Sequence, residues 1–217
     1  KRLINHINSI YRDFKPSPTS RSDFIGDSRF RVVLYTDPAQ PTDSFGGVFY
    51  WNTYREMKGP YGDTVLNILL RENGVKGDFK LNGSACGFSM DGCNQITMWD
   101  AYDNMANGGN FGWWSFASNA VHEIGHLMGL CHSFYCQNEC RDLDLDLEAE
   151  CVTNPCFDDC GGPNIKHCDN WHSGSRNVMG YNGNNDAMTP CQWKTAYRNV
   201  YFSKAKYIRK VNPDGSY

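Results

Sequence analysis

The sequence predicts a mixed α/β (α+β) fold, because segments of helical periodicity alternate with short apolar runs typical of strands. The predicted helices cover residues 2–14, 62–72, 115–128 and 189–208, and the predicted strands cover 30–36, 47–51, 79–82 and 95–99. A length of 217 residues favours one domain. We expect a single unit over residues 1–217, with an upper part at 1–129 and a lower part at 130–217.

The first half of the chain supplies most of the predicted regular elements. In the first helix, apolar residues recur at helical spacing, and Pro16 stops it. The segment 30–36 (FRVVLYT) is typical of a buried strand, and 62–72 carries Val65, Leu66, Leu69 and Leu70 at helical spacing before Asn73-Gly74. The last predicted strand in this half is 95–99.

Two further helices are predicted in the second half, separated by an irregular segment rich in cysteine and acidic residues. Residues 115–128 show the clearest amphipathic pattern, and Gly129 is placed to end that helix. The last helix begins at Thr189-Pro190-Cys191-Gln192, where Thr189 would be the N-cap and Gln192 its partner in a capping box.

Composition limits which cellular compartment and which classes of binding partner are expected. A net charge of −3 offers no general attraction to nucleic acid, and no apolar run is long enough for a membrane span. Ten cysteines indicate an oxidising environment, so we expect a secreted protein in its mature form. Cys86 with Cys93 is the one local disulfide prediction, and eight cysteines lie from residue 131 onward. We expect their bridges to brace the irregular segment, with Cys131 either pinning its neighbour His132 or remaining a competing thiolate.

The chemistry is concentrated in residues 122–132, HEIGHLMGLCH. Residues four apart lie on the same helical face, so His122 and His126 can grip one cation, and Gly129 allows the turn that brings His132 to it. Three neutral imidazoles leave Zn²⁺ an open fourth position, which is typical of a catalytic site. Glu123 is then placed to take a proton from a water molecule. By composition, the five-residue pattern is a roughly one-in-10⁵ coincidence.

Together with Asn177-Val178-Met179-Gly180-Tyr181, this motif resembles the metzincin clan of zinc metalloproteases. The resemblance implies a twisted mixed sheet with an active-site helix and a backing helix, above an irregular disulfide-rich lower subdomain with a C-terminal helix. It makes Met179 the methionine of the turn beneath the metal. Tyr181 resembles the tyrosine that several families place near the metal, as a ligand or as a donor to the oxyanion.

Within the clan, the chain looks most like the pappalysin family, through His132-Ser133-Phe134, 152–155 (VTNP) and 188–192 (MTPCQ). Residues 153–154 depart from the Asp usual in that family, which puts its calcium site in doubt. The resemblance covers residues 94–195 well. It implies that Gln95–Trp99 is the sheet-edge strand to which a substrate adds as an antiparallel strand, with a specificity pocket near residues 181–191.

The implied activity is peptide-bond hydrolysis by one catalytic Zn²⁺, with Glu123 as general base and Tyr181 as second oxyanion donor. Two alternatives remain open: an inactive metzincin-fold binding module, and a cysteine-rich domain in which zinc is purely structural. Ca²⁺ in the acidic segment around 142–159 is a further hypothesis. The expected partner is a protein or peptide substrate; a pro-segment or a protein inhibitor remains open, as does the oligomeric state. His167 and His172 are more simply surface residues than a second zinc site.

Overall fold

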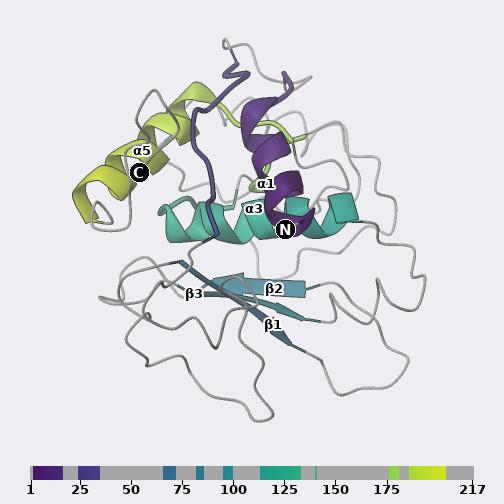
Figure 1. The fold of residues 1–217 in the computed structure, drawn as a ribbon. Helices are drawn as coiled ribbons and strands as arrows, with labels where there is room; N and C mark the ends of the chain where they lie inside the picture. Colours follow the sequence, from purple (N-terminus) through teal and green to yellow (C-terminus); the bar gives the residue numbers. More distant parts are fainter. Residues whose placement is uncertain are drawn as a thin grey trace, which may run out of the picture.

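The computed structural model describes residues 2–16, 24–34, 66–71, 82–85, 95–99, 113–132, 140, 176–180 and 186–203. These residues form the helices α1 (Arg2–Arg12), α3 (Trp113–Leu127) and α5 (Pro190–Ser203), and the strands β1 (Asn67–Arg71), β2 (Asn82–Ala85) and β3 (Gln95–Trp99). Figure 1 shows three layers: the sheet, then α3 across one of its faces, then α1 and α5 on the far side of α3. The described part of the chain is therefore mixed α/β, as predicted.

The sheet has the strand order β1-β3-β2. β1 runs parallel to β3, with Asn67 opposite Gln95, and β2 runs antiparallel to it, with Asn82 opposite Trp99. Ile96 and Met98 of β3 are fully buried. Both edges of β3 are therefore paired, and the expectation that Gln95–Trp99 is the edge strand is wrong. β2 lies at one end of the described sheet and runs antiparallel to β3.

The prediction of a helix at 62–72 is also wrong, because the described part of this segment forms the strand β1. Leu66 and Ile68, two residues apart, pack against the core, as alternate residues of a strand do. Leu70, which the same alternation places on that face, is 48% exposed near the end of the strand. Pairing with β3 along the whole of β1 overrides the helical appearance of the apolar run.

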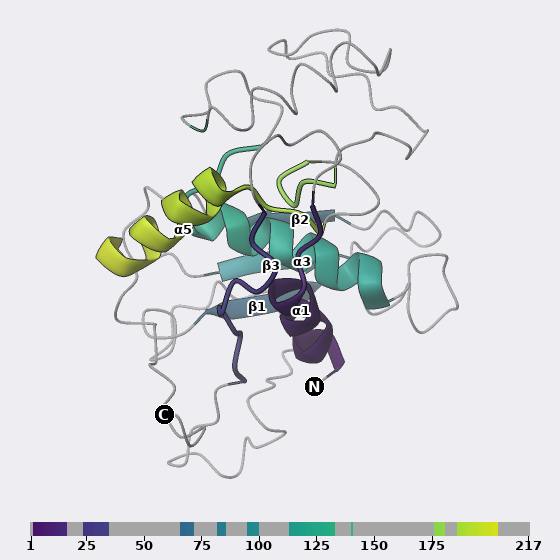
Figure 2. The same ribbon diagram turned by 90° about the horizontal axis from the view of Figure 1, so that it is seen from above.

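The described part of the strand predicted at 30–36 has no regular secondary structure. Its backbone is satisfied by a side chain instead of a neighbouring strand: the Asn8 Nδ2 donates to Val32 O (2.8 Å), and Val32 N donates to Asn8 Oδ1 (2.8 Å). The Phe30 ring packs edge-on against Tyr11 and Trp193. This segment therefore fastens α1 to α5, and Figure 2 shows it running between those two helices.

The predictions of the other helices are confirmed where the structure describes them; residues 204–208 of the last one lie outside the described residues. α1 and α3 agree with the predicted ranges to within two residues at each end. α5 begins with the predicted capping box, in which Gln192 N donates to Thr189 Oγ1 (3.2 Å) and Thr189 N donates to Gln192 Oε1 (3.0 Å). Of the remaining strand predictions, 47–51 lies outside the described residues, and of 79–82 only the last residue is described, as the first of β2.

α3 is the centre of the packing, since it contacts α1 on one side and β2 and β3 on the other. Its buried face of Phe116, Ala117, Ala120, Val121 and Ile124 joins Ile7 and Ile10 of α1 in one hydrophobic core. In Figure 2, α1 crosses α3, while α5 lies beside its C-terminal half. There the Asn199 Nδ2 donates to Met128 O (3.1 Å). α3 is thus held between the sheet and two helices, with α5 beside its histidine-bearing end.

No helix in the described ranges is long and apolar enough to cross a membrane. One disulfide lies within them, between Cys140 and Cys191, and it ties the segment that follows His132 to the first turn of α5. Cys131 is free and exposed, so of the two states expected for it the structure shows the thiol beside a histidine of the motif. Cys86 and Cys93 lie outside the described residues.

Candidate metal centre

α3 ends within the motif, and the turn that ends it positions His126. Gly129 has a φ of 81°, Leu130 N donates to Gly125 O (3.0 Å), and Gly129 N donates to His126 O (2.9 Å). These two bonds form a Schellman motif, for which glycine in the left-handed region is the favoured residue. The turn leaves Leu130 O facing the His126 Nδ1 at 2.8 Å. The helix stop therefore orients the second histidine and directs the chain back toward the first.

The three histidines of the motif converge through their Nε2 atoms. His126 Nε2 lies 3.2 Å from His122 Nε2 and 3.1 Å from His132 Nε2. All three offer ring nitrogens within 4.8 Å of one another. The structure thus brings together all three residues that the spacing predicted, and this group can hold a metal ion.

Backbone carbonyls determine which nitrogens face the centre. The His122 Nδ1 donates to Val178 O (2.7 Å), and the His126 Nδ1 donates to Leu130 O. A neutral ring that donates from Nδ1 keeps a lone pair on Nε2. The Nε2 lone pairs of His122 and His126 therefore point at each other, an arrangement that is unfavourable until a cation lies between them or a ring takes up a proton.

Burial disfavours the second of these options. Desolvation, followed by the neighbouring histidines, lowers the pKa of His122 to about 4 and that of His132 to about 3. The pKa of His126 is also lowered, again mainly by burial. At neutral pH the rings remain uncharged, which is the state that binds metal.

The donor set fits zinc. Tetrahedral Zn²⁺ with Zn–N bonds of about 2.0–2.1 Å requires ligand nitrogens about 3.3–3.4 Å apart. The two Nε2 separations of 3.1 and 3.2 Å are close to that value. Three nitrogen donors leave one tetrahedral position for a further ligand. Among the described residues, the ligand group contains these three histidines and no sulfur.

Glu123 follows the first histidine on the buried side of α3, with only 5% of its surface exposed. Burial raises the pKa of its carboxyl group to about 7. A carboxyl group that titrates near neutrality can both accept and return a proton, as a general base must.

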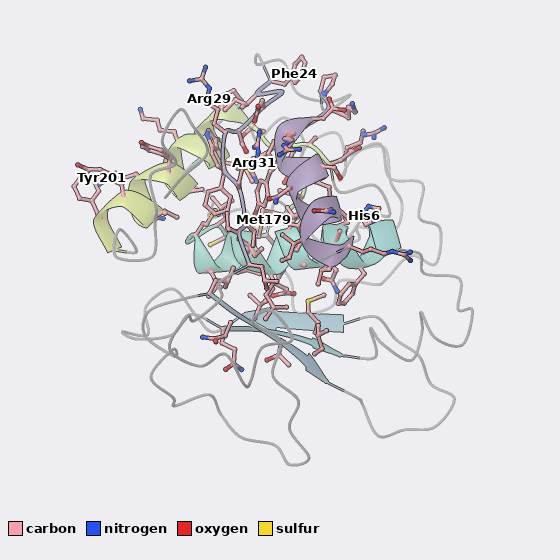
Figure 3. The ribbon with its side chains drawn as sticks, viewed as in Figure 1. His6, Phe24, Arg29, Arg31, Met179 and Tyr201 are labelled. Carbon is pink, nitrogen blue, oxygen red and sulfur yellow. A yellow bond between two sulfur atoms is a disulfide. The ribbon has the colours of Figure 1, made fainter. Side chains whose placement is uncertain are left out.

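The turn at 177–180 packs beneath the histidine-bearing helix. Met179 is fully buried and rests against Gly125, where a Cβ atom would come within van der Waals contact of the Met179 Sδ and 3.3 Å from its Cε. Figure 3 shows the labelled Met179 beside α3. The same turn supplies Val178 O to His122. The structure thus places Met179 against α3, between His122 and His126.

Tyr181 lies outside the described residues, as do the acidic segment of the calcium hypothesis, His167 and His172. The bonds from Val178 O and Leu130 O to the ring nitrogens could not be read from the sequence, because a backbone carbonyl has no signature there. The contact between Asn177 and Gln192 was also not predicted, although both residues stand in segments that the sequence marked.

The chain was compared with protein-family models and with curated proteins. No family model matches it, and no curated protein matches it significantly. A function for this chain is therefore inferred from the geometry of the site and from the motif.

Proposed function

We propose that this chain is a secreted zinc-dependent endopeptidase with a metzincin-type catalytic domain, most similar to the pappalysins. The observation that carries the proposal is the convergence of His122, His126 and His132, the first of which is followed in sequence by the buried Glu123. The contact of Met179 with Gly125 supports the metzincin type. A disulfide in the lower part of the chain agrees with secretion.

The three histidines would hold Zn²⁺, and Glu123 would move the proton. When bound, zinc supplies a Lewis acid that lowers the pKa of a water ligand from 15.7 toward about 7. Glu123 accepts a proton from the attacking water and returns it to the departing amine nitrogen, so that one carboxyl group serves both steps. Its raised pKa suits this exchange, because the protonated and ionised forms are of similar free energy near neutral pH.

An extended substrate would pair with β2. This strand runs antiparallel to β3 at one end of the described sheet, and it contacts α3. Main-chain hydrogen bonds from such an edge would give affinity without demanding a particular sequence. Tyr181 remains the candidate for a second oxyanion donor, and residues 181–191 remain the candidate specificity region.

The test is cleavage of a fluorescent peptide library by the zinc-loaded protein, with and without a chelator. Glu123→Gln keeps the shape of the side chain and removes its basicity, so it should bind one zinc and lose nearly all turnover. An active Glu123→Gln variant would refute the general-base role.

The two alternatives give different results in the same assay. A metzincin-fold binding module would bind zinc and cleave no library peptide. A structural zinc site would have all four positions filled by the protein, and its removal would unfold the chain without any loss of activity to measure.

A further inference from the structure

Two buried carboxamides face each other between the turn at 177–180 and the start of α5. The Asn177 Nδ2 donates to Gln192 Oε1 (2.8 Å), and the Gln192 Nε2 donates to Asn177 Oδ1 (3.0 Å). Neither side chain is more than 1% exposed. Such a reciprocal amide pair is specific in direction, because each group must present its oxygen to the other's nitrogen.

Each side-chain oxygen of the pair also accepts a hydrogen bond from a backbone N–H group. Asn177 Oδ1 accepts a second bond from Met179 N (2.9 Å), and Gln192 Oε1 accepts a second bond from Thr189 N (3.0 Å). The pair therefore joins the conformation of the turn to the capping box of α5. Gln192 belongs to the amide pair and to the capping box, since its own backbone N–H donates to Thr189 Oγ1.

The turn in question holds the metal centre at two points. Val178 O accepts the hydrogen bond from the His122 Nδ1, and the Met179 side chain rests against Gly125, between the first two histidines. The Val178 carbonyl is placed by its own peptide unit, whose other end, Met179 N, is bonded to Asn177. A chain of direct contacts thus runs from the Gln192 carboxamide to the first metal ligand.

We propose that Gln192 is a positioning residue of the metal centre: paired with Asn177, its carboxamide fixes the turn that presents Val178 O to the His122 Nδ1. Outer partners of this kind orient metal-bound imidazoles, and their loss typically lowers metal affinity about 10–100-fold. The inference depends on the metal site and not on peptide hydrolysis, so a chain that binds zinc but cleaves no peptide leaves it standing.

Gln192→Glu separates positioning from helix capping. Glutamate is a usual third residue of a capping box, so the remaining oxygen can still accept from Thr189 N and from the Asn177 Nδ2. Its second oxygen, however, faces Asn177 Oδ1 in place of a donor. At alkaline pH, where the new carboxyl group is ionised, the amide pair is broken while the cap is kept.

The measurement is Zn²⁺ affinity by competition with a chromophoric chelator, with the visible spectrum of the Co²⁺-substituted protein as a second readout. At the alkaline pH that ionises the new carboxyl group, Gln192→Glu should bind Zn²⁺ about 10–100-fold more weakly than the unmodified chain and change the Co²⁺ spectrum, because the first imidazole is no longer held in one orientation. Affinity and spectrum equal to those of the unmodified chain would overturn the proposal, whatever the peptidase assay shows.

Two control variants serve as matched comparisons for Gln192→Glu. Thr189→Val removes the hydroxyl half of the cap and leaves the amide pair, and Asn199→Ala removes another amide contact of the same helix, the one to Met128 O. Both should lower the melting temperature without changing Zn²⁺ affinity. A loss of affinity as large as that of Gln192→Glu in either control would reduce Gln192 to a general structural role and overturn the proposal.

A measurement on the unmodified protein keeps the proposal testable if Gln192→Glu does not fold. The His122 Nδ1–H should appear in long-range ¹H–¹⁵N spectra as one sharp hydrogen-bonded signal that exchanges with solvent as slowly as the Met179 amide. A rapidly exchanging or averaged signal would show that the turn does not fix this ring.

Discussion

Gly125→Ala is expected to destabilise the protein, although the same change inside a helix usually stabilises. Gly125 lies in α3 between His122 and His126. A Cβ atom at this position would overlap the Met179 Sδ and lie 3.3 Å from its Cε and 3.7 Å from the Leu130 Cδ1. Because Met179 is fully buried, its thioether can move away only by displacing other core atoms.

Two opposing contributions set the magnitude. Replacing glycine by alanine in a helix interior gains about 1 kcal/mol of helix propensity. Adding a methyl group to a filled core costs about 1–3 kcal/mol. The net loss should therefore be about 1 kcal/mol, or a fall of about 2–4 °C in the melting temperature of a chain of this size.

A double-mutant cycle on the metal-free protein, followed by urea denaturation, isolates this contact. In a Met179→Ala background the overlap is gone, so Gly125→Ala should stabilise by about 1 kcal/mol from helix propensity. The sign of the same substitution thus reverses, with a coupling of about 2 kcal/mol between the two sites. Stabilisation by Gly125→Ala in the unmodified chain would refute the close packing of the turn beneath the helix.

Further predictions concern the metal, an ion pair and the disulfide. Because burial lowers the pKa of His122 to about 4 and of His132 to about 3 from the ordinary 6.5, protons should displace zinc only below about pH 5; release near pH 6.5, followed with a zinc-sensitive dye, would contradict the burial of the rings. Arg176→Ala leaves its carboxylate partner Asp186, whose side chain is 7% exposed, buried and without this ion pair. This variant should lose about 1–3 kcal/mol in urea denaturation at neutral pH, and a change within measurement error would contradict the bidentate pair. Replacing both Cys140 and Cys191 by serine opens a link across 51 residues and should cost about 4 kcal/mol; a smaller loss of unfolding free energy would mean that the unfolded chain is already compact.

The sequence predicted best those features that depend on local pattern. Residues 115–128 were recognised by their period, Gly129 by the need for a left-handed residue after the helix, and Thr189 with Gln192 by the capping box. The three histidines follow from the same local geometry, because helical spacing and one turn are enough to bring them together.

The predictions that failed depended on partners distant in sequence. Residues 67–71 form a strand because β3 offers them a parallel neighbour, and an apolar run of this length carries no sign of that partner. Residues 30–34 remain irregular because the Asn8 side chain satisfies Val32 on both its N–H and its C=O. The place of β3 in the middle of the sheet likewise depends on β2, whose short sequence NGSA is not typical of a strand.

The same limit applies to the site. The identity of the ligands is local information, but their orientation comes from Val178, 56 residues away from His122, and from Leu130 in the helix stop. The side chains of Asn177 and Gln192 reinforce one of these carbonyls through contacts between distant elements. A sequence can therefore name the metal ligands without showing what holds them.

The most direct test of the proposed metal centre is X-ray absorption at the zinc edge of the purified, zinc-loaded protein, with the metal content measured on the same sample. We predict one zinc per chain, bound by three imidazole nitrogens and one oxygen of a solvent molecule, with Zn–N distances of about 2.0–2.1 Å. A shell that includes sulfur would contradict this centre, because it would place a cysteine such as Cys131 on the metal. A shell filled by four protein ligands would also contradict it, since no position would remain for the water that Glu123 is proposed to activate.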